Sequence, residues 1–417
     1  MNVGSIIKHH RVKQAMTQKE LCEGICSISH LSKIENNSKE VNRETLNMLL
    51  ERLHIKLEDE ENNHKRLEQQ LSDFIEAILF QNKGLSTRIY EELKYNEEYI
   101  SITDMVNTYT LYVFRYHSFM GNFEESFRFY KILKKLSNNF SQHEIYLFEY
   151  FYAVYSLIKD PFTATSTTSL KTLKSLYDEF DKFPTIIHGE LLYYLASAYF
   201  QVSNFHKASF FVSEALKIYS SDFNLARIMH SQILLASCYT LLGLFDQAAK
   251  TFKVMINNIE CQTPGVDLYY FYHDYGFFLK ETKNYTKAIE YYKKAMKLSK
   301  PSYYYYMTLI DIAECFYRLN DISKSLSIFK SCIKTFKDLN FKDLYLISTF
   351  YIKLIEKDNS AMNFLEEELL PYCFENSLFY NVVSFSSFLQ NYYENKLNFE
   401  KAYKYKKYYS ELNREVF

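Results

Sequence analysis

Residues 195–208 read LASAYFQVSNFHKA, and the same pattern returns three times further along the chain. The later copies are 235–248 (LASCYTLLGLFDQA), 275–288 (YGFFLKETKNYTKA) and 312–325 (IAECFYRLNDISKS). Each copy has a small residue near its start, a turn in its middle and another small residue at its end. Successive copies are offset by 40, 40 and 37 residues. A regular offset of this length predicts a chain built from stacked structural repeats.

The small residues within a copy predict two antiparallel helices that cross closely. Ala196 lies twelve residues before Ala208, and Ala215 lies seven after it. The other copies have small or slim residues at the same offsets. A small side chain at a crossing lets two helix backbones approach, while large rings fill the space against the next hairpin. This is the tetratricopeptide (TPR) pattern with slightly extended loops.

Weaker copies extend the repeat in both directions. The turn signature recurs at 121–126 (GNFEES) and 397–402 (LNFEKA). Helical pairs without the full signature fit residues at about 64–95, 142–182 and 341–371. We therefore expect about nine TPR-like hairpins, wound into a right-handed superhelix.

The composition favours an all-α fold. Gly (8) and Pro (5) are scarce among the 417 residues, which excludes a turn-dense all-β sandwich or barrel. Aromatic residues reach 18% of the chain through 39 Tyr and 35 Phe, with no Trp. We interpret this excess as the packing of the repeat core and not as a ring-lined cofactor site.

Cysteine content and hydropathy indicate the cellular context. The seven cysteines are scattered and do not form a disulfide framework, which suggests a reducing compartment. His9, His10 and Arg11 stand where a secretory signal would be apolar. No uninterrupted apolar stretch approaches the ~20 residues of a membrane span. We expect a cytoplasmic protein that does not bind membranes.

The amino-terminal part of the chain has the pattern of a helix-turn-helix. Thr17 and Glu20 form a capping box that predicts a helix start. A tight connection around Gly24 separates this helix from a second short one over 28–35, and 41–53 reads as a longer amphipathic helix. Residues up to 39 carry a formal net charge of +3, whereas the whole chain carries −1. Two short helices with a Gly-containing turn and a basic character are typical of helix-turn-helix DNA binding.

This head resembles the lambdoid-repressor (Xre) type of helix-turn-helix over about 55 residues. The matching string is Arg11…Thr17-Gln18-x-Glu20-Leu21…Ser27-x-Ser29-x-Leu31-Ser32-Lys33-Ile34-Glu35-Asn36. The resemblance implies that Arg11 and Glu35 form a buried ion pair between the first helix and the recognition helix. It also implies the following DNA-contacting residues: Gln18, Ser27, Ser29, His30 and Lys33. Ile28 and Ser29 stand where some relatives carry Gln or Arg, so we expect sparse direct base readout.

The inner face of the repeat is the second place where we expect function. A stack of hairpins leaves one side of each first helix facing a groove suited to a short peptide. Counting from the small residues gives these groove-facing candidates: Arg115, Tyr193, Ser197, Ser237, His273, Glu314 and Asn391. Arg offers a planar fork to a carboxylate and Asn pairs with an extended backbone, so Arg115 and Asn391 are the expected anchors. The alternative is a wetted groove without a ligand.

The sequence contains no motif that predicts catalysis or metal binding. It has no Gly-rich phosphate loop, no H-E-x-x-H and no nucleophile elbow. Cys22, Cys26 and His30 are four residues apart, but a turn separates the first from the last, and packing explains them better than a metal does. We expect no enzyme activity, no cofactor and no metal.

The combination of an Xre-type head (1–60) and a TPR-like domain (61–417) resembles the RRNPP family of peptide-responsive quorum-sensing regulators, in particular its NprR-type members. The head resembles the family in its sequence motif, whereas the repeats resemble it in their architecture. It implies a transcription regulator whose partners are double-stranded operator DNA and a short signalling oligopeptide in the repeat groove. It also implies a homodimer or a higher oligomer, assembled through the repeat domain.

Two other functions fit the same parts. The resemblance to NprR-type members also implies binding of a sporulation response regulator, which would make the repeat domain a protein-sequestering module. A phage or plasmid repressor with this architecture is the other alternative. The sequence leaves these alternatives open.

Overall fold

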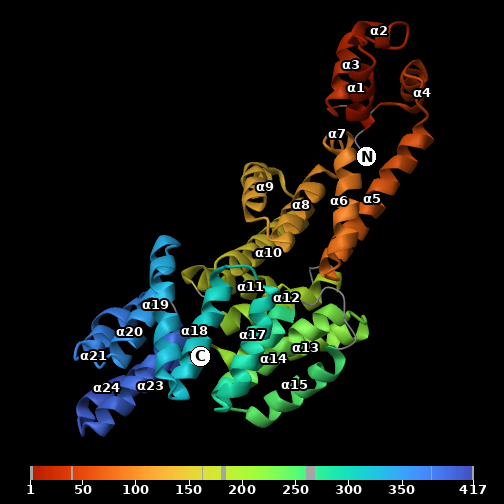
Figure 1. Ribbon diagram of the computed structural model, residues 1–417. Coiled ribbons are helices and arrows are strands. Elements are labelled where there is room, and N and C mark those ends of the chain that lie inside the picture. Colours follow the sequence, from red (N-terminus) through yellow and green to blue (C-terminus); the bar gives the residue numbers. More distant parts are fainter. Residues whose placement is uncertain are drawn as a thin grey trace. The chain divides into compact units, whose positions relative to one another are not determined.

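The structure is a computed structural model (Figure 1), which describes residues 3–38, 41–161, 163–179, 185–259, 268–376 and 378–415. Every regular element in these ranges is helical, and no strand occurs among them. The chain divides into two compact units, residues 1–155 and 156–417. The predicted all-α class is confirmed.

Unit 1 begins with a head of four helices. They are α1 (Val3–Lys13), α2 (Gln18–Cys22), α3 (Ile28–Glu35) and α4 (Arg43–Arg52). Their apolar faces share one core, whose buried members include Ile7, Leu21, Leu31, Ile34 and Leu49. Gly4 allows α1 to approach α3, since a Cβ at this position would lie 1.8 Å from the backbone oxygen of Ile34. The short helices are therefore held by packing against one another.

The rest of unit 1 consists of helical pairs. In chain order these are α5 (Leu57–Leu79), α6 (Lys83–Tyr95), the short α7 (Glu97–Ile100), α8 (Val106–Met120) and α9 (Phe123–Leu136). A single 3-10 turn, η1 (Ser137–Asn139), leads into α10 (Gln142–Lys159), which crosses the division between the units. Helix α5 packs on α6, and α8 packs on α9.

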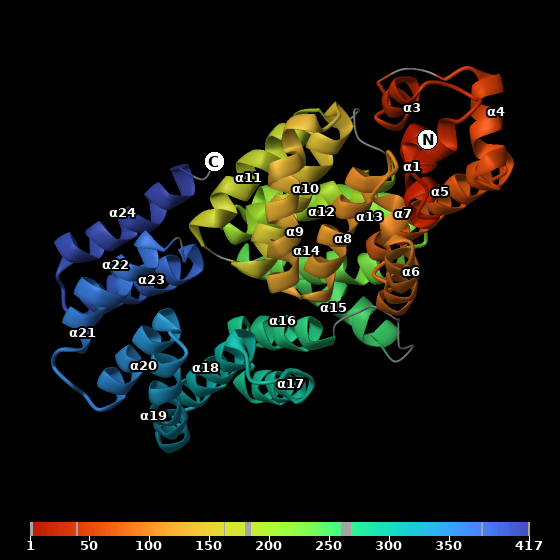
Figure 2. The ribbon, with the colours of Figure 1, turned by 90° about the horizontal axis from the view of Figure 1, so that it is seen from above.

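Unit 2 continues the same pattern (Figure 2). Its first helices are α11 (Ala164–Asp178), α12 (Thr185–Gln201), α13 (Phe205–Ser221), α14 (Leu225–Leu241), α15 (Phe245–Ile259), α16 (Leu268–Glu281) and α17 (Tyr285–Leu298). They are followed by α18 (Tyr303–Arg318), α19 (Ile322–Asp338), α20 (Lys342–Ile355), α21 (Ala361–Phe364), a π-helical turn η3 (Leu365–Leu369), α22 (Leu370–Glu375), α23 (Phe379–Asn395) and α24 (Phe399–Glu415). With the short α7 set aside, and with α21, η3 and α22 taken together as the partner of α20, the described helices after the head follow one another as nine pairs, as predicted.

Small residues stand at the helix crossings, as their spacing predicted. Ala196, Ala208 and Ala215 are fully buried between α12 and α13. The corresponding positions of the next pairs are filled by residues that are likewise buried: Ala236, Ala248, Met255, Ala288, Ala295, Ala313, Ser325 and Cys332. At Gly276, on α16, a Cβ would lie 2.8 Å from the ring of Tyr292 on α17. The spacing of the small residues along the chain therefore marks the positions at which one helix closely approaches the next.

The turn inside each hairpin has a common backbone geometry. Ser203, Gly243, Lys283 and Asn320 occupy equivalent positions, and all four have a positive φ between 60° and 72°. A left-handed residue just after a helix ends it and redirects the chain. In two copies the next residue then caps the second helix, as when Asn204 Oδ1 accepts from the backbone N–H of Lys207 at 3.1 Å.

We expect Gly276→Ala to destabilise unit 2 by about 1–3 kcal/mol, because the added methyl group has no space beside Tyr292. Gly84→Ala on α6 is the matched control, because the nearest atom to a Cβ there is 3.9 Å away. That change should be neutral or stabilise by about 0.5–1 kcal/mol. Urea unfolding followed by circular dichroism compares the two variants. Equal changes in the free energy of unfolding in the two variants would show that the crossing of α16 and α17 accommodates the added methyl group.

Candidate functional site

The helix-turn-helix is built by two local capping arrangements. Thr17 Oγ1 accepts from the backbone N–H of Glu20 at 3.2 Å, and Glu20 Oε2 accepts from the backbone N–H of Thr17 at 2.7 Å. This is the predicted capping box, and it begins α2. Gly24, with a φ of +72°, turns the chain, and Ser27 Oγ then accepts from the backbone N–H of His30 to begin α3. The predicted helix-turn-helix geometry is confirmed.

A buried ion pair ties the recognition helix α3 to α1. Arg11 Nε donates to Glu35 Oε1 at 2.6 Å, and Arg11 Nη2 donates to Glu35 Oε2 at 3.0 Å. The side chains are 12% and 1% exposed. The bond to Glu35 raises the pKa of the Arg11 guanidinium, against the opposing effect of burial. Gln18 Nε2 also donates to Glu35 Oε2, at 2.8 Å. The implied Arg11–Glu35 pair is therefore confirmed, and Gln18 braces it.

One of the predicted DNA-contacting residues, Gln18, bonds to Glu35, and the others lie on α3 or at its N-cap. Ser27, Ser29 and Lys33 are exposed on α3 or at its start, while Gln18 and His30 are half-buried. Ser29 and Lys33 are four residues apart and so share one face of the helix. Their contacts with DNA stay a prediction.

Arg52, at the end of α4, has a structural role that no motif in the sequence indicated. Its Nη1 donates to the backbone oxygen of Leu21 at 3.0 Å and also to that of Glu23. These carbonyls end α2, where a helix leaves its last acceptors without partners. Arg52 therefore holds the turn that leads into α3.

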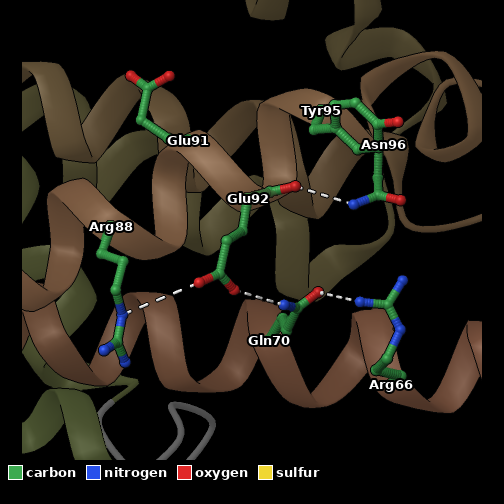
Figure 3. A pocket seen from close by; sticks show the side chains of 7 residues that line it. All are labelled: Arg66, Gln70, Arg88, Glu91, Glu92, Tyr95 and Asn96. Atoms are coloured by element: carbon green, nitrogen blue, oxygen red, sulfur yellow. Dashed lines mark hydrogen bonds and ion pairs between the residues drawn. The ribbon is translucent and has the colours of Figure 1, made fainter.

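A pocket lies between α5 and α6 (Figure 3), lined by Arg66, Gln70, Arg88, Glu91, Glu92, Tyr95 and Asn96. Its polar groups bond to one another across the two helices. Arg66 Nη1 donates to Gln70 Oε1 at 3.2 Å, and Gln70 Nε2 donates to Glu92 Oε2 at 2.9 Å. Because these groups satisfy one another at the surface, we assign no ligand to the pocket.

In unit 2 a polar network crosses the first helices of successive pairs. On α16, His273 Nδ1 lies 3.0 Å from Asp274 Oδ1, and His273 Nε2 lies 3.4 Å from Asp311 Oδ2 on α18. Ser237 Oγ, on α14, donates to Asp274 Oδ2 at 2.7 Å. Burial alone would lower the pKa of His273, but the bonds to Asp274 and Asp311 raise it to about 9. The imidazole is therefore a cation held between two carboxylates.

The network continues through Lys280 to α20. Lys280 Nζ donates to Asp311 Oδ1 at 2.6 Å and to Glu314 Oε2 at 3.1 Å. Tyr351 OH donates to Glu314 Oε1 at 3.0 Å. Burial raises the pKa of Asp311, but Lys280 and His273 outweigh it and hold that pKa at about 2. The carboxylates stay partly accessible, since the side chains of Asp311 and Glu314 are 17% and 22% exposed.

Three of the predicted groove residues, Ser237, His273 and Glu314, belong to this network. Tyr193 and Ser197 lie half-buried on α12, where the Tyr193 ring lies 5.3 Å from the guanidinium of Arg227. Asn391 is exposed on α23, and Arg115 is fully buried on α8 of unit 1. The structure thus brings three of the seven candidates together.

Counting from the small residues missed Asp274, Asp311 and Tyr351. A spacing signal would have found them, because the hydrogen-bonded partners on neighbouring first helices are 37 residues apart, close to the offset of the repeats. Ser237, Asp274 and Asp311 are separated by 37 residues each, as are Glu314 and Tyr351. Polar residues that recur at the repeat period share a face of adjacent first helices and can meet.

Within the described ranges, no three His, Cys, Asp or Glu side chains gather as a metal site would require. None of the helices that the structure describes is both long enough and apolar enough to cross a bilayer.

Comparison with known proteins adds three findings. A helix-turn-helix family model matches residues 7–59. Over 405 residues the chain is 24% identical to the transcriptional activator NprA of Geobacillus stearothermophilus, a match that covers 93% of this chain and 97% of the relative. Two crystal structures share the fold over 84% of this chain. NprR in complex with its cognate peptide NprX has a TM-score of 0.67, 20% identity and 98% coverage of that chain. A Rap protein complexed with competence and sporulation factor has a TM-score of 0.72, 13% identity and 99% coverage.

These findings, together with the geometry above, define the class of the molecule as a helix-turn-helix protein with a TPR-like repeat domain. More particularly, the chain has the architecture of an RRNPP-type regulator with a helix-turn-helix head, as its sequence resemblance implied.

We expect Arg11→Met to destabilise the head by about 3–5 kcal/mol, because it leaves the buried Glu35 carboxylate without its cation. The double change Arg11→Met/Glu35→Met removes both charges and should be milder. Hydrogen exchange of α1 and α3 in the full chain measures the difference. Small and equal effects from both variants would contradict a structural role for the pair.

The pKa of His273 also predicts a pH dependence. Because its folded pKa of about 9 lies above the ordinary 6.5, its contribution to stability is complete below pH 6.5 and is lost as pH rises towards 9. We expect the free energy of unfolding of unit 2 to fall by on the order of 1–3 kcal/mol over that range. His273→Gln should flatten this slope, whereas His143→Gln, at an exposed position on α10, should keep it. Thermal unfolding at several pH values measures this dependence of stability on pH. If His273→Gln leaves the dependence unchanged, the raised pKa of His273 is contradicted.

Proposed function

We propose that this chain is a cytoplasmic transcription regulator that acts by binding and not by catalysis. Its head, residues 1–60, binds operator DNA, and its repeat domain, 61–417, binds a short signalling peptide that controls the head. The observation that carries the proposal is the presence in one chain of a helix-turn-helix and a partly exposed ionic network on the first helices of successive repeat pairs. The similarity to the transcriptional activator NprA and the fold shared with peptide-bound NprR support it.

The DNA-binding part of the proposal rests on helix α3. Ser29 and Lys33 present a hydroxyl and an ammonium on its exposed face, and the Arg11–Glu35 pair fixes the helix against α1. In helix-turn-helix proteins this second helix enters the major groove. Lys33 is a point charge suited to a phosphate, whereas Ser29 reaches a base edge or the sugar-phosphate backbone.

The peptide-binding part rests on the network around Lys280. Its carboxylates and hydroxyls come from the first helices of four successive pairs, so an extended ligand lying along them would meet polar groups at each repeat. The groups are already oriented by bonds to one another, which lowers the cost of ordering them on binding. Asp311, Glu314 and Tyr351 offer ionic and hydrogen-bonding contacts to a peptide backbone or its charged groups.

The chain is further proposed to act as a homodimer assembled through the repeat domain. The last hairpin exposes Leu397, Phe399 and Tyr403, whose exposed fractions are 75%, 66% and 68%. The terminal unit of a repeat normally has a polar outer face. Two heads joined in this way would read the two halves of a palindromic operator.

We expect Lys33→Ala to weaken binding to a duplex selected from random DNA with the wild-type chain. Loss of one phosphate contact should also reduce the slope of log affinity against log salt by about one unit. Fluorescence anisotropy at several salt concentrations measures both effects. Lys65→Ala, at an exposed position of α5 outside the head, is the control. If Lys33→Ala binds like the control, α3 does not contact DNA as proposed.

The peptide site is tested with Glu314→Gln and Tyr351→Phe. A peptide selected from a random heptapeptide library on the immobilised wild-type chain serves as the probe. We expect each variant to weaken its binding about tenfold in isothermal titration, because each removes one polar contact or the partner that orients it. Glu290→Gln and Tyr95→Phe make the same chemical changes at exposed positions of α17 and α6. Wild-type affinity in both network variants would place the ligand elsewhere.

A further inference from the structure

The head has no free linker to the helices that follow it. Helix α4 ends at Arg52 and α5 begins at Leu57, so only residues 53–56 connect them. Ile55 and Leu57 pack against the apolar core of the head. Gln14, in the turn just after α1, donates through Nε2 to the backbone oxygen of Leu53 at 2.7 Å. The core of the head therefore extends over the connection and onto the first turn of α5.

A polar cluster joins three helices beside this connection. His10 Nε2, on α1, lies 3.2 Å from Glu60 Oε1 on α5. Tyr99 OH, on α7, donates to Glu60 Oε2 at 2.8 Å. One carboxylate thus uses one oxygen for the head and the other for the helix that follows the first hairpin. We call His10, Glu60 and Tyr99 the junction cluster.

Aromatic contacts reinforce the junction cluster. The His9 ring meets the His10 ring edge-on, with centroids 5.3 Å apart, and meets the Tyr99 ring edge-on at 6.4 Å. The side chains of His10 and Glu60 are 21% and 12% exposed. A fully solvated ion pair contributes little to stability, because water screens it and both side chains lose freedom. Glu60 is shielded from water and has two partners, so its contacts are stronger than those of a surface pair.

The electrostatics of Glu60 agree with this geometry. The contact with His10 lowers the pKa of Glu60, and the Tyr99 hydroxyl adds to this effect, while burial opposes it. The group is therefore ionised at neutral pH, and the hydrogen bond that it accepts from the Tyr99 hydroxyl is charge-assisted.

We propose that Glu60 is a positioning residue that locks the DNA-binding head onto α5 and α7, so that the head and the first hairpin move as one piece. The attachment of the head to α5 and α7 is inferred from the contacts of the junction cluster. Only its consequence for DNA binding rests on the proposed function. A head on a flexible linker would accept half-sites at many separations. A locked head has its orientation set by the helices that follow it, and it accepts half-sites at only a few separations.

Hydrogen exchange of the free full-length chain tests the lock without DNA. In Glu60→Gln and Tyr99→Phe we expect the backbone amides of α7 and of the first turn of α5 to exchange about tenfold faster than in the wild type. The amides of α3 should be unchanged. Tyr99→Phe keeps the ring beside His9 and removes only the hydroxyl, so it guards against a general loss of folding. Glu61→Gln, at the exposed neighbouring position, is the control.

Two exchange results would overturn the lock. One is exchange at α5 and α7 within twofold of the wild type in both variants. The other is faster exchange at α3 as well, which would mean that the variants unfold the head instead of releasing it.

A second measurement tests the consequence for DNA. The probes are duplexes carrying two copies of a half-site selected with the wild-type chain, at different separations. We expect Glu60→Gln to bind a single half-site like the wild type but to tolerate a wider range of separations. An unchanged range would overturn the positioning role. If the wild-type chain binds no DNA, the proposed function fails, while the exchange result still decides whether the lock exists.

Discussion

The close approach of two helices at a small residue is the constraint on which the repeat domain depends. Ala196, Ala236, Gly276 and Ala313 stand at successive crossings, each one buried under the partner helix. Because the crossings repeat along the chain, the first helices of neighbouring pairs lie side by side. This packing places Ser237 beside Asp274 and Glu314 beside Tyr351, each pair 37 residues apart and so close to the offset of the repeats. The ionic network is therefore a consequence of the packing period.

The period and the capping residues made the fold predictable. The small-residue spacing predicted the hairpins, and Thr17, Gly24 and Glu20 predicted the helix-turn-helix, because these signals are local. The site was predictable only in part. Counting selected Ser237, His273 and Glu314, which the structure brings into one network, but it also selected Arg115, which is fully buried. The spacing of residues along a helix predicts which face they share. How deeply each one is buried depends on the neighbouring helices, which this spacing does not describe.

The junction between head and body was not predictable from the sequence, for a related reason. Glu60 stands in the run Glu58-Asp59-Glu60-Glu61, where each member is equally consistent with a solvated helix start. Only the positions of α1 and α7 distinguish Glu60 from its neighbours, through His10 and Tyr99. The expected boundary at residue 60 falls within α5, and the head belongs to a compact unit that extends to residue 155. The head and the first hairpins therefore belong to one compact unit.

A peptide-controlled regulator requires that DNA binding by the head and ligand binding by the repeat domain be coupled in one molecule. The most direct measurement is the affinity of the wild-type chain for its selected duplex, determined with and without a saturating amount of the selected peptide. We expect the peptide to change this affinity by a factor of about 5–150, and the duplex to change the affinity for the peptide by the same factor. Identical DNA affinity in the presence and absence of bound peptide would contradict this coupling.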